Sequence, residues 1–379
     1  MTASAECLWD VAVVGAGPAG SATALRLARK GVRTLLIEAS RFDRMRVGES
    51  LAPAVRPLLE HLGAWSSFLE LVPIASYGTR SVWGRAQCDE HSHLLTPFGC
   101  GWHIERARFD AMLANRAVAA GASLWLGARV SSCEATHAGF RLQLTASEPR
   151  QSLGEVNARF IVDATGRRTA LARFLGARHK TFDRLIGIGQ EYADPAASNH
   201  PYTLVETTPQ GWWYAAPLAP QRSMLMLMTD ADLARDARWG DSTQWLDALA
   251  STQHVRARVR AAAPSSTPHT YCAVSQRLLR DPQGPRGWLA VGDAALAVDP
   301  ISGSGVIRAF RTAQAAAPAI IAALQENLTA IDEYEMARHH ECTDYLIERA
   351  NYYALEQRWR SAFWLRRQRA IENAIALAS

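Results

Sequence analysis

The sequence predicts an α/β fold in which an N-terminal βαβ unit is combined with an antiparallel sheet and C-terminal helices. The first observation is a strand–turn–helix–strand pattern between Asp10 and Glu38. The second is the block of residues 181–269, where short β-rich segments alternate with turns that contain Pro and Gly. The third is a series of helical patterns that follows Gly305. Together these observations indicate two kinds of sheet in one chain.

The opening pattern has the order of a βαβ unit. Val11–Val14 form a short β-branched run that predicts a buried strand. The residues from Gly15 to Gly20 read GAGPAG and match G-x-G-x-x-G. Apolar residues at helical spacing then predict a helix over Ser21–Lys30, and Thr34–Ile37 predict a second buried strand that ends in Glu38.

Each part of this pattern fits a bound dinucleotide. Gly15 permits the tight turn, Gly17 lets the backbone approach a pyrophosphate, and Gly20 lets the helix lie close to the strand. The helix N-terminus offers free N–H groups and the positive end of its dipole to the phosphates. Glu38, 23 residues after Gly15, is placed to accept hydrogen bonds from a ribose and would repel the 2′-phosphate of NADP. A structural glycine turn in another βαβ unit is the alternative.

Length and composition allow one large α/β unit or two intimate domains. The chain has 379 residues, 48% of them hydrophobic. Its net charge of +5 is small for this length and gives no indication of nucleic-acid binding. The six cysteines are scattered without a C-x-x-C, which argues against a metal site or a disulfide framework and favours a cytoplasmic location. The first strand begins too early for a cleaved signal peptide. The longest apolar stretch, Ala315–Leu324, is too short for a transmembrane segment and contains Pro318.

The segment after the second strand combines arginines with a G-E-S motif. Arg41, Arg44 and Arg46 precede Gly48–Ser50, and a helix is expected over Pro53–Leu62. Arginines just beyond a ribose carboxylate are placed to meet the phosphates of a dinucleotide. A solvated basic loop is the alternative.

The middle of the chain continues the α/β pattern. A helix is expected over Arg108–Ala120, a strand over Leu124–Leu126 and a hairpin over Val130–Leu144. Phe160–Gly166 form a buried strand that enters a glycine turn, which is the geometry of a second cofactor contact.

Residues 181–269 change character. Three alternating β-rich segments, Tyr202–Thr207, Trp212–Leu218 and Ser223–Thr229, are separated by turns and predict an antiparallel sheet. A helix over Gln244–Ala261 is expected to close this block.

The last third of the chain returns to a buried strand at residues 287–295. The glycine-rich segment Asp299–Val306 follows and opens a long helix that ends near Leu324. Two further helices are expected over Ala330–Ala350 and Tyr353–Leu377.

Four motifs now stand in one order along the chain: GAGPAG with Glu38, ERARFD at 105–110, VDATGRR at 162–168 and GDAALAVDPISGSG at 292–305. In combination they resemble the flavoprotein monooxygenases that share the glutathione-reductase-type FAD fold. The resemblance covers nearly the whole chain. It implies an FAD that extends across the first βαβ unit, with its isoalloxazine ring under the antiparallel sheet.

The motifs and the resemblance together give the expected domains and cofactor contacts. The FAD-binding domain is discontinuous and comprises residues 6–80, 104–180 and 270–325. The substrate domain comprises residues 81–103 and 181–269, and the C-terminal helices run from 326 to 379. The expected FAD contacts are Gly15, Gly17, Pro18, Ala19, Gly20, Glu38, Ala39, Arg46, Ser50, Arg106, Val130, Thr165, Gly166, Gly292, Asp293, Pro300, Gly303, Gly305 and Val306.

Two further stretches point to one branch of that class. VGESLAP at 47–53 and GWWYAAPL at 211–218 resemble the branch with tryptophan halogenases and with flavoproteins that hydroxylate aromatic residues during maturation of protein-derived quinone cofactors. The tail YYALEQRWRSAFWLRRQR at 352–369 looks more like the maturation group. The halogenases carry a catalytic Lys downstream of the G-E motif and a Glu in D-P-L-E-S-T-G. Here Arg80 is the only cation in the first region and Ser302 replaces that Glu, and an Arg does not replace a nucleophilic Lys.

The resemblance implies hydroxylation of an electron-rich aromatic ring, Trp- or Tyr-like, by the C4a-hydroperoxide that reduced flavin forms with O2. The turn at 300–306 would direct N–H groups and a helix dipole toward the flavin, and an ordinary helix start is the alternative. A His at 103 is a candidate base or a structural residue, and core packing is the alternative for each aromatic side chain. No catalytic side chain is identified. The expected substrate pocket contains Arg80, Trp83, His103, Trp212, Trp213 and Tyr214.

The remaining expectations concern partners. Electrons would come from NAD(P)H or a separate flavin reductase, because no second G-x-G-x-x-G unit is evident, and O2 is the co-substrate. The substrate is an aromatic small molecule or a residue of a peptide or protein. The tail carries five arginines that belong to an amphipathic helix docked on the core, or else to a docking surface for a protein substrate: Arg358, Arg360, Arg366, Arg367 and Arg369. A halogenase, a reductase of isoprenoid double bonds and a non-catalytic flavin-binding protein are the alternative functions.

Overall fold

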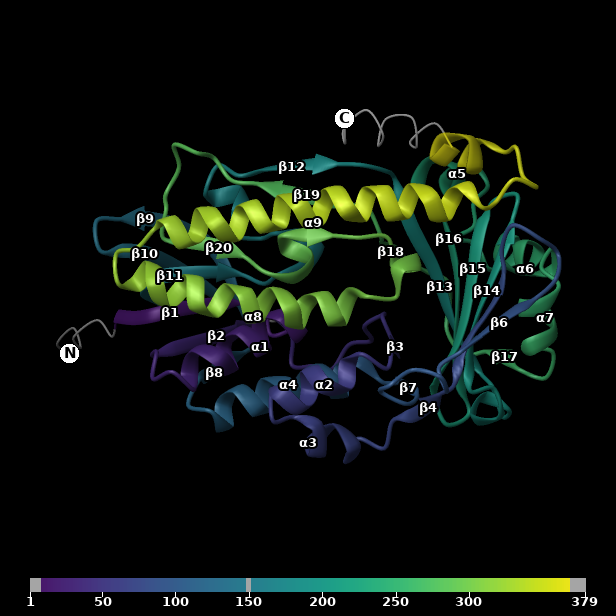
Figure 1. The fold of residues 1–379 in the computed structure, drawn as a ribbon, viewed down its shortest axis with the longest axis horizontal. Helices are drawn as coiled ribbons and strands as arrows, with labels where there is room; N and C mark the ends of the chain where they lie inside the picture. The colour runs from purple at the N-terminus through teal and green to yellow at the C-terminus, as the bar shows by residue number, and fades with distance from the viewer. Residues whose placement is uncertain (1–7, 148–150, 369–379) are drawn as a thin grey trace.

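Two large sheets stand at opposite ends of the molecule. The computed structural model describes residues 8–147 and 151–368. Within them, the long helix α9 (Thr329–Ala354) runs from the seven-stranded sheet to the eight-stranded sheet (Figure 1). The seven-stranded sheet contains the βαβ unit, and the eight-stranded sheet contains the β-rich block of residues 181–269. The architecture is the α/β fold with a second, largely antiparallel sheet that the sequence predicts.

The seven-stranded sheet is parallel at its centre. Its order is β8-β2-β1-β11-β10-β9, and β20 pairs with β11. Val14 pairs with Ile37 on one side and with Asp163 on the other, so the carboxyl ends of three parallel strands meet at one edge. Ligands of open α/β sheets bind at this edge. The strands are β1 (Leu8–Val14), β2 (Thr34–Glu38), β8 (Ser123–Leu126), β9 (Ala128–Thr136), β10 (Gly139–Ala146), β11 (Ser152–Asp163) and β20 (Trp288–Ala290).

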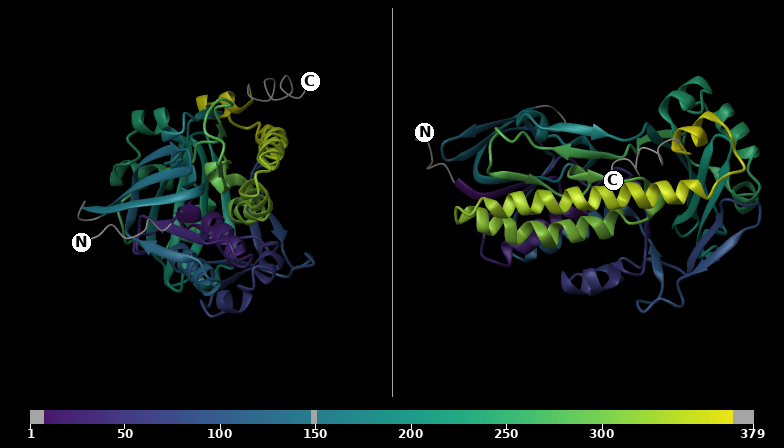
Figure 2. Two further views of the ribbon diagram at one scale, coloured as in Figure 1. Left: turned by 90° about the vertical axis from the view of Figure 1, so that its left-hand side faces the viewer. Right: turned by 45° about the horizontal axis from the view of Figure 1, so that its top comes forward.

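Helices α1 (Pro18–Ala28), α4 (Arg106–Ala119) and α8 (Gly305–Leu324) pack on one face of this sheet. Leu25, Phe109 and Phe310 are almost completely buried in the core between them. α8 and α9 lie side by side (Figure 2). A second core on the other face of the sheet includes Val130 and Leu171. Both faces of the sheet are therefore covered, as its continuous apolar strands require.

The eight-stranded sheet has the order β17-β13-β16-β15-β14-β5-β6, with β18 beside β13. We call the side toward the seven-stranded sheet and α9 the inner face. The outer face carries α6 (Ser242–Ala250) and α7 (His254–Arg258), as Figure 1 shows. The strands are β5 (Gly78–Val82), β6 (Asp89–Ser92), β13 (Leu185–Ala193), β14 (Tyr202–Thr208), β15 (Gly211–Ala219), β16 (Arg222–Asp230), β17 (Ala263–Pro264) and β18 (His269–Cys272).

Short elements connect the two large sheets. β3 (Ser50–Leu51), β7 (Gly101–His103) and β4 (Ile74–Ser76) form one small sheet, and β12 (Arg178–Thr181), β19 (Gln276–Leu279) and β21 (Leu296–Ala297) form another. The remaining helices are α2 (Val55–His61), α3 (Trp65–Leu69) and α5 (Ala231–Asp236). Single 3-10 turns occur at Gly166–Arg168, Ala172–Phe174, Ala197–Asn199, Gly292–Ala294 and Pro300–Ser302.

The single helix expected over Gln244–Ala261 is instead two helices, α6 and α7. The buried carboxylate of Glu206 on β14 accepts hydrogen bonds from the backbone N–H groups of Gln253, His254 and Val255, at 2.7–2.9 Å. It therefore starts a new helix at His254. A side chain distant in sequence made this break, so local periodicity did not reveal it.

The last helix begins later than expected. Tyr353 still belongs to α9, and residues 362–368 are helical, whereas the expected end at Leu377 lies outside the described residues. Glu356 is completely buried and accepts hydrogen bonds from the N–H groups of Gly84 and Arg358, both at 2.9 Å, which ends α9. The proposed domain boundary at residue 80 falls within β5.

Candidate functional site

The glycine loop between β1 and α1 contains two glycines that the fold requires and one that it does not. A Cβ on Gly15, whose φ is +104°, would lie 2.3 Å from the Ala164 carbonyl oxygen, and a Cβ on Gly20 would lie 1.9 Å from that of Gly15. A Cβ on Gly17 would meet no protein atom within 4 Å. Gly17 N-caps α1 without a side-chain hydrogen bond, and Pro18 and Ala19 form the first turn. The loop is thus an open cradle of backbone amides, suited to phosphate.

Glu38 is fixed beside this loop. Its Oε2 accepts a hydrogen bond from the Ala16 N–H at 2.8 Å, and its Oε1 accepts from the backbone and hydroxyl of Ser40 at 3.0 and 2.7 Å. Burial would raise the pKa of Glu38, but the Arg46 charge and these hydrogen bonds outweigh it and hold the pKa below its ordinary value. The carboxylate is therefore ionised beside the phosphate cradle, where a ribose would lie. Ala39 follows it directly, and its carbonyl accepts from Ser147.

Asp110 holds two arginines of the motif region. The buried carboxylate pairs with Arg46 at 2.8 Å and with Arg106 at 3.1 Å. Arg46 also pairs with Glu38 at 2.8 Å, so both of its terminal nitrogens are engaged within the protein. Arg106 donates to the Val47 carbonyl at 2.8 Å. These contacts brace the ribose end of the cradle and fix the segment that leads to Ser50.

A second turn lies at the end of β11. Asp163 accepts hydrogen bonds from the backbone and hydroxyl of Thr165, at 3.0 and 2.6 Å, and shapes the turn through Gly166. Arg167 follows and pairs with Asp293 at 3.3 Å. The N–H of Gly292 donates to the Thr312 hydroxyl at 3.0 Å. The structure thus brings the third and fourth motifs together beside the first, whereas Val130 lies in the core on β9.

The third turn connects Asp299 to α8. Asp299 N-caps the turn through its Oδ1, which accepts from the Ile301 N–H at 3.0 Å, and Pro300 follows it. Gly303 has a φ of +57°, and α8 begins at Gly305 and Val306 without a side-chain cap. A Cβ on Gly305 would meet no atom within 4 Å, so this helix start is also an open cradle.

Helix α9 contacts this turn through Asp299. The Tyr353 hydroxyl donates to Asp299 Oδ2 at 2.8 Å, and Arg349 lies 4.0 Å from the same oxygen. Burial raises the pKa of Asp299, and the Arg349 charge opposes that rise. Burial and the neighbouring Asp299 raise the pKa of Tyr353 well above its ordinary value, so Tyr353 stays a hydrogen-bond donor at neutral pH.

The turns converge on the inner face of the eight-stranded sheet. Val47, before Ser50, and Ile301, in the Asp299 turn, both pack against one buried cluster. Methionines at every second position of β16 and tyrosines of β15 and β18 belong to this cluster, as alternation along a strand requires. The cluster members from the sheet are Leu185, Val205, Trp212, Tyr214, Met224, Met226, Met228 and Tyr271. A ligand that extends from the phosphate cradle past the Asp299 turn would end here.

A polar cluster borders this convergence. The Ser50 hydroxyl lies 3.0 Å from His103 Nδ1, 2.8 Å from the Tyr214 hydroxyl and 3.2 Å from the Thr203 hydroxyl. Burial lowers the pKa of His103 to about 3, with Arg258 adding to the effect, so the imidazole is neutral. Its Nε2 is buried without a hydrogen-bond partner. Burial, followed by the Glu49 charge, raises the pKa of Tyr214 well above its ordinary value.

The expected aromatic substrate chamber does not form. Trp213 points to the outer face and packs on Trp245, whereas Trp212 and Tyr214 point to the inner face. Trp83 is 8% exposed and packs between Tyr352, Tyr353 and Trp364. Arg80 lies on the outer face with a half-exposed side chain, paired with Glu90 at 3.1 Å. Strand alternation separates Trp213 and Arg80 from the inner-face cluster that contains Trp83, Trp212 and Tyr214, and core packing explains the tryptophans.

The basic tail is docked rather than free. Arg367 is 4% exposed and pairs with Asp230 at 2.9 Å, and Arg366 pairs with Asp230 and Asp232 at 2.8 and 2.6 Å. Arg358 pairs with the buried Glu356 at 2.6 Å. Arg369 lies outside the described residues. The amphipathic-helix interpretation is the one that these contacts support.

Sequence reasoning missed several residues at the convergence. Tyr353 and Arg349 come from a helix that carries no motif, and Thr203 and Tyr271 come from separate strands. The alternation Met224-Leu225-Met226-Leu227-Met228 was a usable signal for one face of a strand. Among the described residues, no helix has the length and apolar character to cross a membrane, and no group of three or more acids, His or Cys is arranged to hold a metal.

Known proteins resemble this chain along nearly its whole length. A family model described as "FAD binding domain" matches residues 9–347. A protein of Marinomonas mediterranea described as an FAD-dependent oxidoreductase, LodB, is 29% identical over 366 residues, which is 95% of this chain and 96% of LodB. Tryptophan 2-halogenase of Chondromyces crocatus is 28% identical over 96% of this chain and 71% of its own length.

The solved structures agree with these relatives. The myxobacterial chondrochloren halogenase, an FAD-dependent halogenase, superposes with a TM-score of 0.83 at 25% identity, over 99% of this chain and 90% of that one. The flavin-dependent halogenase CmlS also gives a TM-score of 0.83, at 22% identity, over 98% of this chain and 70% of that one, which shows the fold alone.

Proposed function

The chain belongs to the FAD binding domain family and is an FAD-dependent oxidoreductase of the halogenase and monooxygenase kind, and on that premise we propose that it hydroxylates an electron-rich aromatic ring. The proposal concerns the reaction within the family. It rests on the side chains at the inner face, and on the fact that Arg80 and Ser302 stand where tryptophan halogenases carry a Lys and a Glu.

The residues at the two helix starts fit FAD. Gly17 and Gly305 each leave open space where a Cβ would stand, and both helices begin without a side-chain cap. Backbone N–H groups are therefore available to the diphosphate at α1 and to the flavin ring at α8. Glu38 would hold the ribose, and Asp293, held by Arg167, offers acceptors for hydroxyl groups of the cofactor.

FAD supplies, when reduced, the activation of O2. The protein must hold the ring, exclude water and place the substrate. The dipole of α8 stabilises negative charge at the end of the ring that it faces. Met224, Met226 and Tyr271 form an apolar wall at the inner face, which favours an aromatic substrate and limits access of water.

One observation carries the choice of hydroxylation over halogenation. The chain contains two lysines, Lys30 in the turn after α1 and Lys180 on β12, and both are exposed. Arg80, in the region where tryptophan halogenases carry their catalytic Lys, belongs to the outer face. Ser302 stands where those enzymes carry a Glu. A relay that needs a lysine amine near the flavin therefore has no candidate residue here.

Positioning rather than general-base catalysis is the mode that the site supports. A His103 with a pKa of about 3 is a weak base, and it stays neutral throughout the physiological range. Ser50, His103 and Tyr214 instead form a fixed polar border that orients the hydroxyl or N–H group of a substrate ring.

The substrate is proposed to be a Trp- or Tyr-like ring, free or within a peptide. The resemblance of the tail at 352–369 to flavoproteins that act in quinone cofactor maturation supports a protein-borne ring as the substrate. Electrons would come from NAD(P)H or a partner reductase. The described cysteines, Cys88, Cys100, Cys133, Cys272 and Cys342, are all free, which supports a cytoplasmic location.

The test combines reduced FAD, O2 and a panel of rings: L-tryptophan, L-tyrosine and short peptides that contain each. Mass spectrometry should find a product heavier by one oxygen atom, with O2 consumed in step. Reduction of a carbon–carbon double bond without O2 uptake would favour the alternative of an isoprenoid reductase. A halogenase is the second candidate, because relatives named as halogenases match most of the chain.

A further inference from the structure

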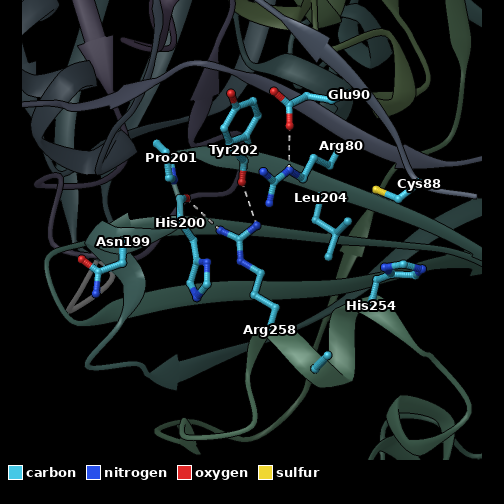
Figure 3. Close-up of a pocket in the computed structure, with 11 residues that line it drawn as sticks. Arg80, Cys88, Glu90, Asn199, His200, Pro201, Tyr202, Leu204, His254 and Arg258 are labelled. Atoms are coloured by element: carbon cyan, nitrogen blue, oxygen red, sulfur yellow. Dashed lines mark hydrogen bonds and ion pairs between the residues drawn. The ribbon is translucent and has the colours of Figure 1, made fainter.

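A cavity lies on the outer face of the eight-stranded sheet, away from the cofactor turns. Its volume is about 730 Å³, within the range of small-molecule sites. Tyr202 and Leu204 of β14 form its floor, and they alternate with Thr203, which points to the inner face. Arg80 and Glu90 close one side, and His254 and Arg258 of α7 close the other (Figure 3). The cavity is therefore separate from the FAD site by the thickness of a sheet.

Arg258 is a charged group without a charged partner. Its guanidinium donates to the carbonyls of Tyr202, Ala215 and His200, at 2.7, 3.0 and 3.3 Å. Its Nε is buried without a hydrogen-bond partner, and no ion pair of Arg258 occurs among the described residues. Burial lowers the pKa of Arg258 to about 10, which leaves the group charged at neutral pH. The Asp194 carboxylate favours the Arg258 charge without an ion pair between the two, and the hydrogen bonds of the guanidinium go to carbonyls alone. A desolvated charge with this little compensation is costly, and an anion in the cavity would offset that cost.

Arg80 is a second positive group that faces the same space. The guanidinium ends of Arg80 and Arg258 extend toward one another from opposite walls (Figure 3). His200 also lines the cavity but is neutral at neutral pH, because burial and then the Arg258 charge lower its pKa. Glu90 is the single acid of the lining, and it is already bound to Arg80 Nε at 3.1 Å. Like charges collected around a cavity repel one another, so the arrangement is stabilised when an anion lies between them.

We propose that this cavity binds a small organic anion, whose carboxylate or phosphate group lies between the guanidinium groups of Arg80 and Arg258. The body of the ligand packs on Tyr202 and Leu204, which favours an aromatic or apolar group of modest size. A planar guanidinium pair matches carboxylate and phosphate geometry. The proposal is independent of the reaction proposed for the flavin site.

The test uses the FAD-loaded full chain, so that the cofactor's own phosphate cradle is occupied. Benzoate, phenyl phosphate and the neutral benzamide are titrated by calorimetry. We expect at least one anion to bind with a Kd below about 1 mM and about tenfold tighter than benzamide. The stronger of the two anions tells a carboxylate ligand from a phosphate ligand. Equal binding of benzamide and both anions, or no binding at all, would overturn the proposal.

Matched variants locate the binding. Arg80 is half exposed and its ion pair contributes little to stability, so Arg80→Met should fold and weaken the anion about tenfold. Arg85→Met is the control, because Arg85 also pairs with an acid of the same hairpin, Asp89, but does not line the cavity. Arg258→Met should abolish binding if it folds. Anion affinity that is unchanged in Arg80→Met, with full FAD content, would place the anion elsewhere and contradict the assignment.

Discussion

The hydroxyl group of Tyr353 donates a hydrogen bond to Oδ2 of Asp299, with 2.8 Å between the two oxygens and 54 positions between the residues. The same hydroxyl accepts from Trp212 Nε1 at 3.0 Å. One buried group therefore joins the C-terminal helix α9, the turn that opens α8, and the inner face of the eight-stranded sheet. The shape of the turn that would meet the flavin depends on a helix outside every cofactor motif.

Tyr353→Phe should weaken FAD binding several-fold and lower the free energy of unfolding by about 1–3 kcal/mol, because buried polar groups lose their partner. Asp299 Oδ2 would keep only Arg349, at 4.0 Å. Flavin fluorescence titration and urea unfolding measure the two effects. Tyr352→Phe is the control, since Tyr352 packs on Trp83 and is 36% exposed. A Tyr353→Phe variant that binds FAD as wild type does would remove α9 from the account of the turn.

Gly17→Val should separate folding from cofactor binding. The backbone of Gly17 has φ −73° and ψ −175°, which any residue adopts, and a Cβ there meets no protein atom within 4 Å. We expect a folded, colourless protein, because the branched side chain occupies the place of the pyrophosphate. Gly20→Val is the contrast: its Cβ would collide with the Gly15 carbonyl, and the fold itself should suffer. The absorbance ratio of flavin to protein and the far-UV circular dichroism read out the two cases. Full flavin content in Gly17→Val would show that FAD does not use this loop.

The parts of the site that lie next to one another in sequence were predictable. The strand, the glycine loop and Glu38 are local, and their chemistry follows from spacing. The order of the four motifs was also enough to indicate the FAD fold, and the alternating β-rich segments of residues 181–269 indicated the second sheet. What the sequence did not give was the pairing of distant elements, because Asp299 with Tyr353 and Ser50 with Tyr214 are contacts made by the tertiary fold alone.

The predicted aromatic group does not lie on one face of the sheet, for a simple physical reason. Trp212 and Trp213 are neighbours in a strand, so their side chains point to opposite faces of the sheet. The same rule, applied to GWWYAAPL before grouping its residues, separates Trp213 from Tyr214. The helix break at Glu206 and the cavity beside Arg258 depend on contacts between elements that are distant in sequence, so no local pattern predicts them.

The tail arginines give a prediction about stability, because their ion pairs anchor the tail to the core instead of leaving it as a docking surface for a substrate. Arg367→Met should lower the free energy of unfolding by about 3–5 kcal/mol, because the buried Asp230 carboxylate would lose one of its two arginine partners and keep only Arg366. Arg366→Met should cost less than about 1 kcal/mol, since Arg366 is 40% exposed. Denaturant unfolding of both variants measures the difference. Equal and small effects would mean that the tail is not anchored through Asp230.

His103 makes stability depend on pH in one direction. Its pKa falls from 6.5 to about 3 in the folded protein, through burial and then Arg258 and His93, so between these values the unfolded chain binds a proton that the folded chain does not. Stability is therefore lost as the pH falls below 6.5, with a slope of up to about 1.4 kcal/mol per pH unit from this group, and is unaffected by it above 6.5. His103→Gln should flatten the curve in that window. Parallel curves for the two proteins between pH 4 and 6.5 would show that His103 is not neutral in the fold.

The most direct test of the account is the fate of oxygen and bromide in a single reaction. Wild-type protein with reduced FAD, ¹⁸O₂ and the ring that gives most product is run with and without bromide, and the product mass is measured. Because no lysine stands near the flavin-facing surfaces, we predict one ¹⁸O atom in the product and the same yield in both samples. A product with the bromine isotope pair, formed only when bromide is present, would contradict the account and identify a halogenase.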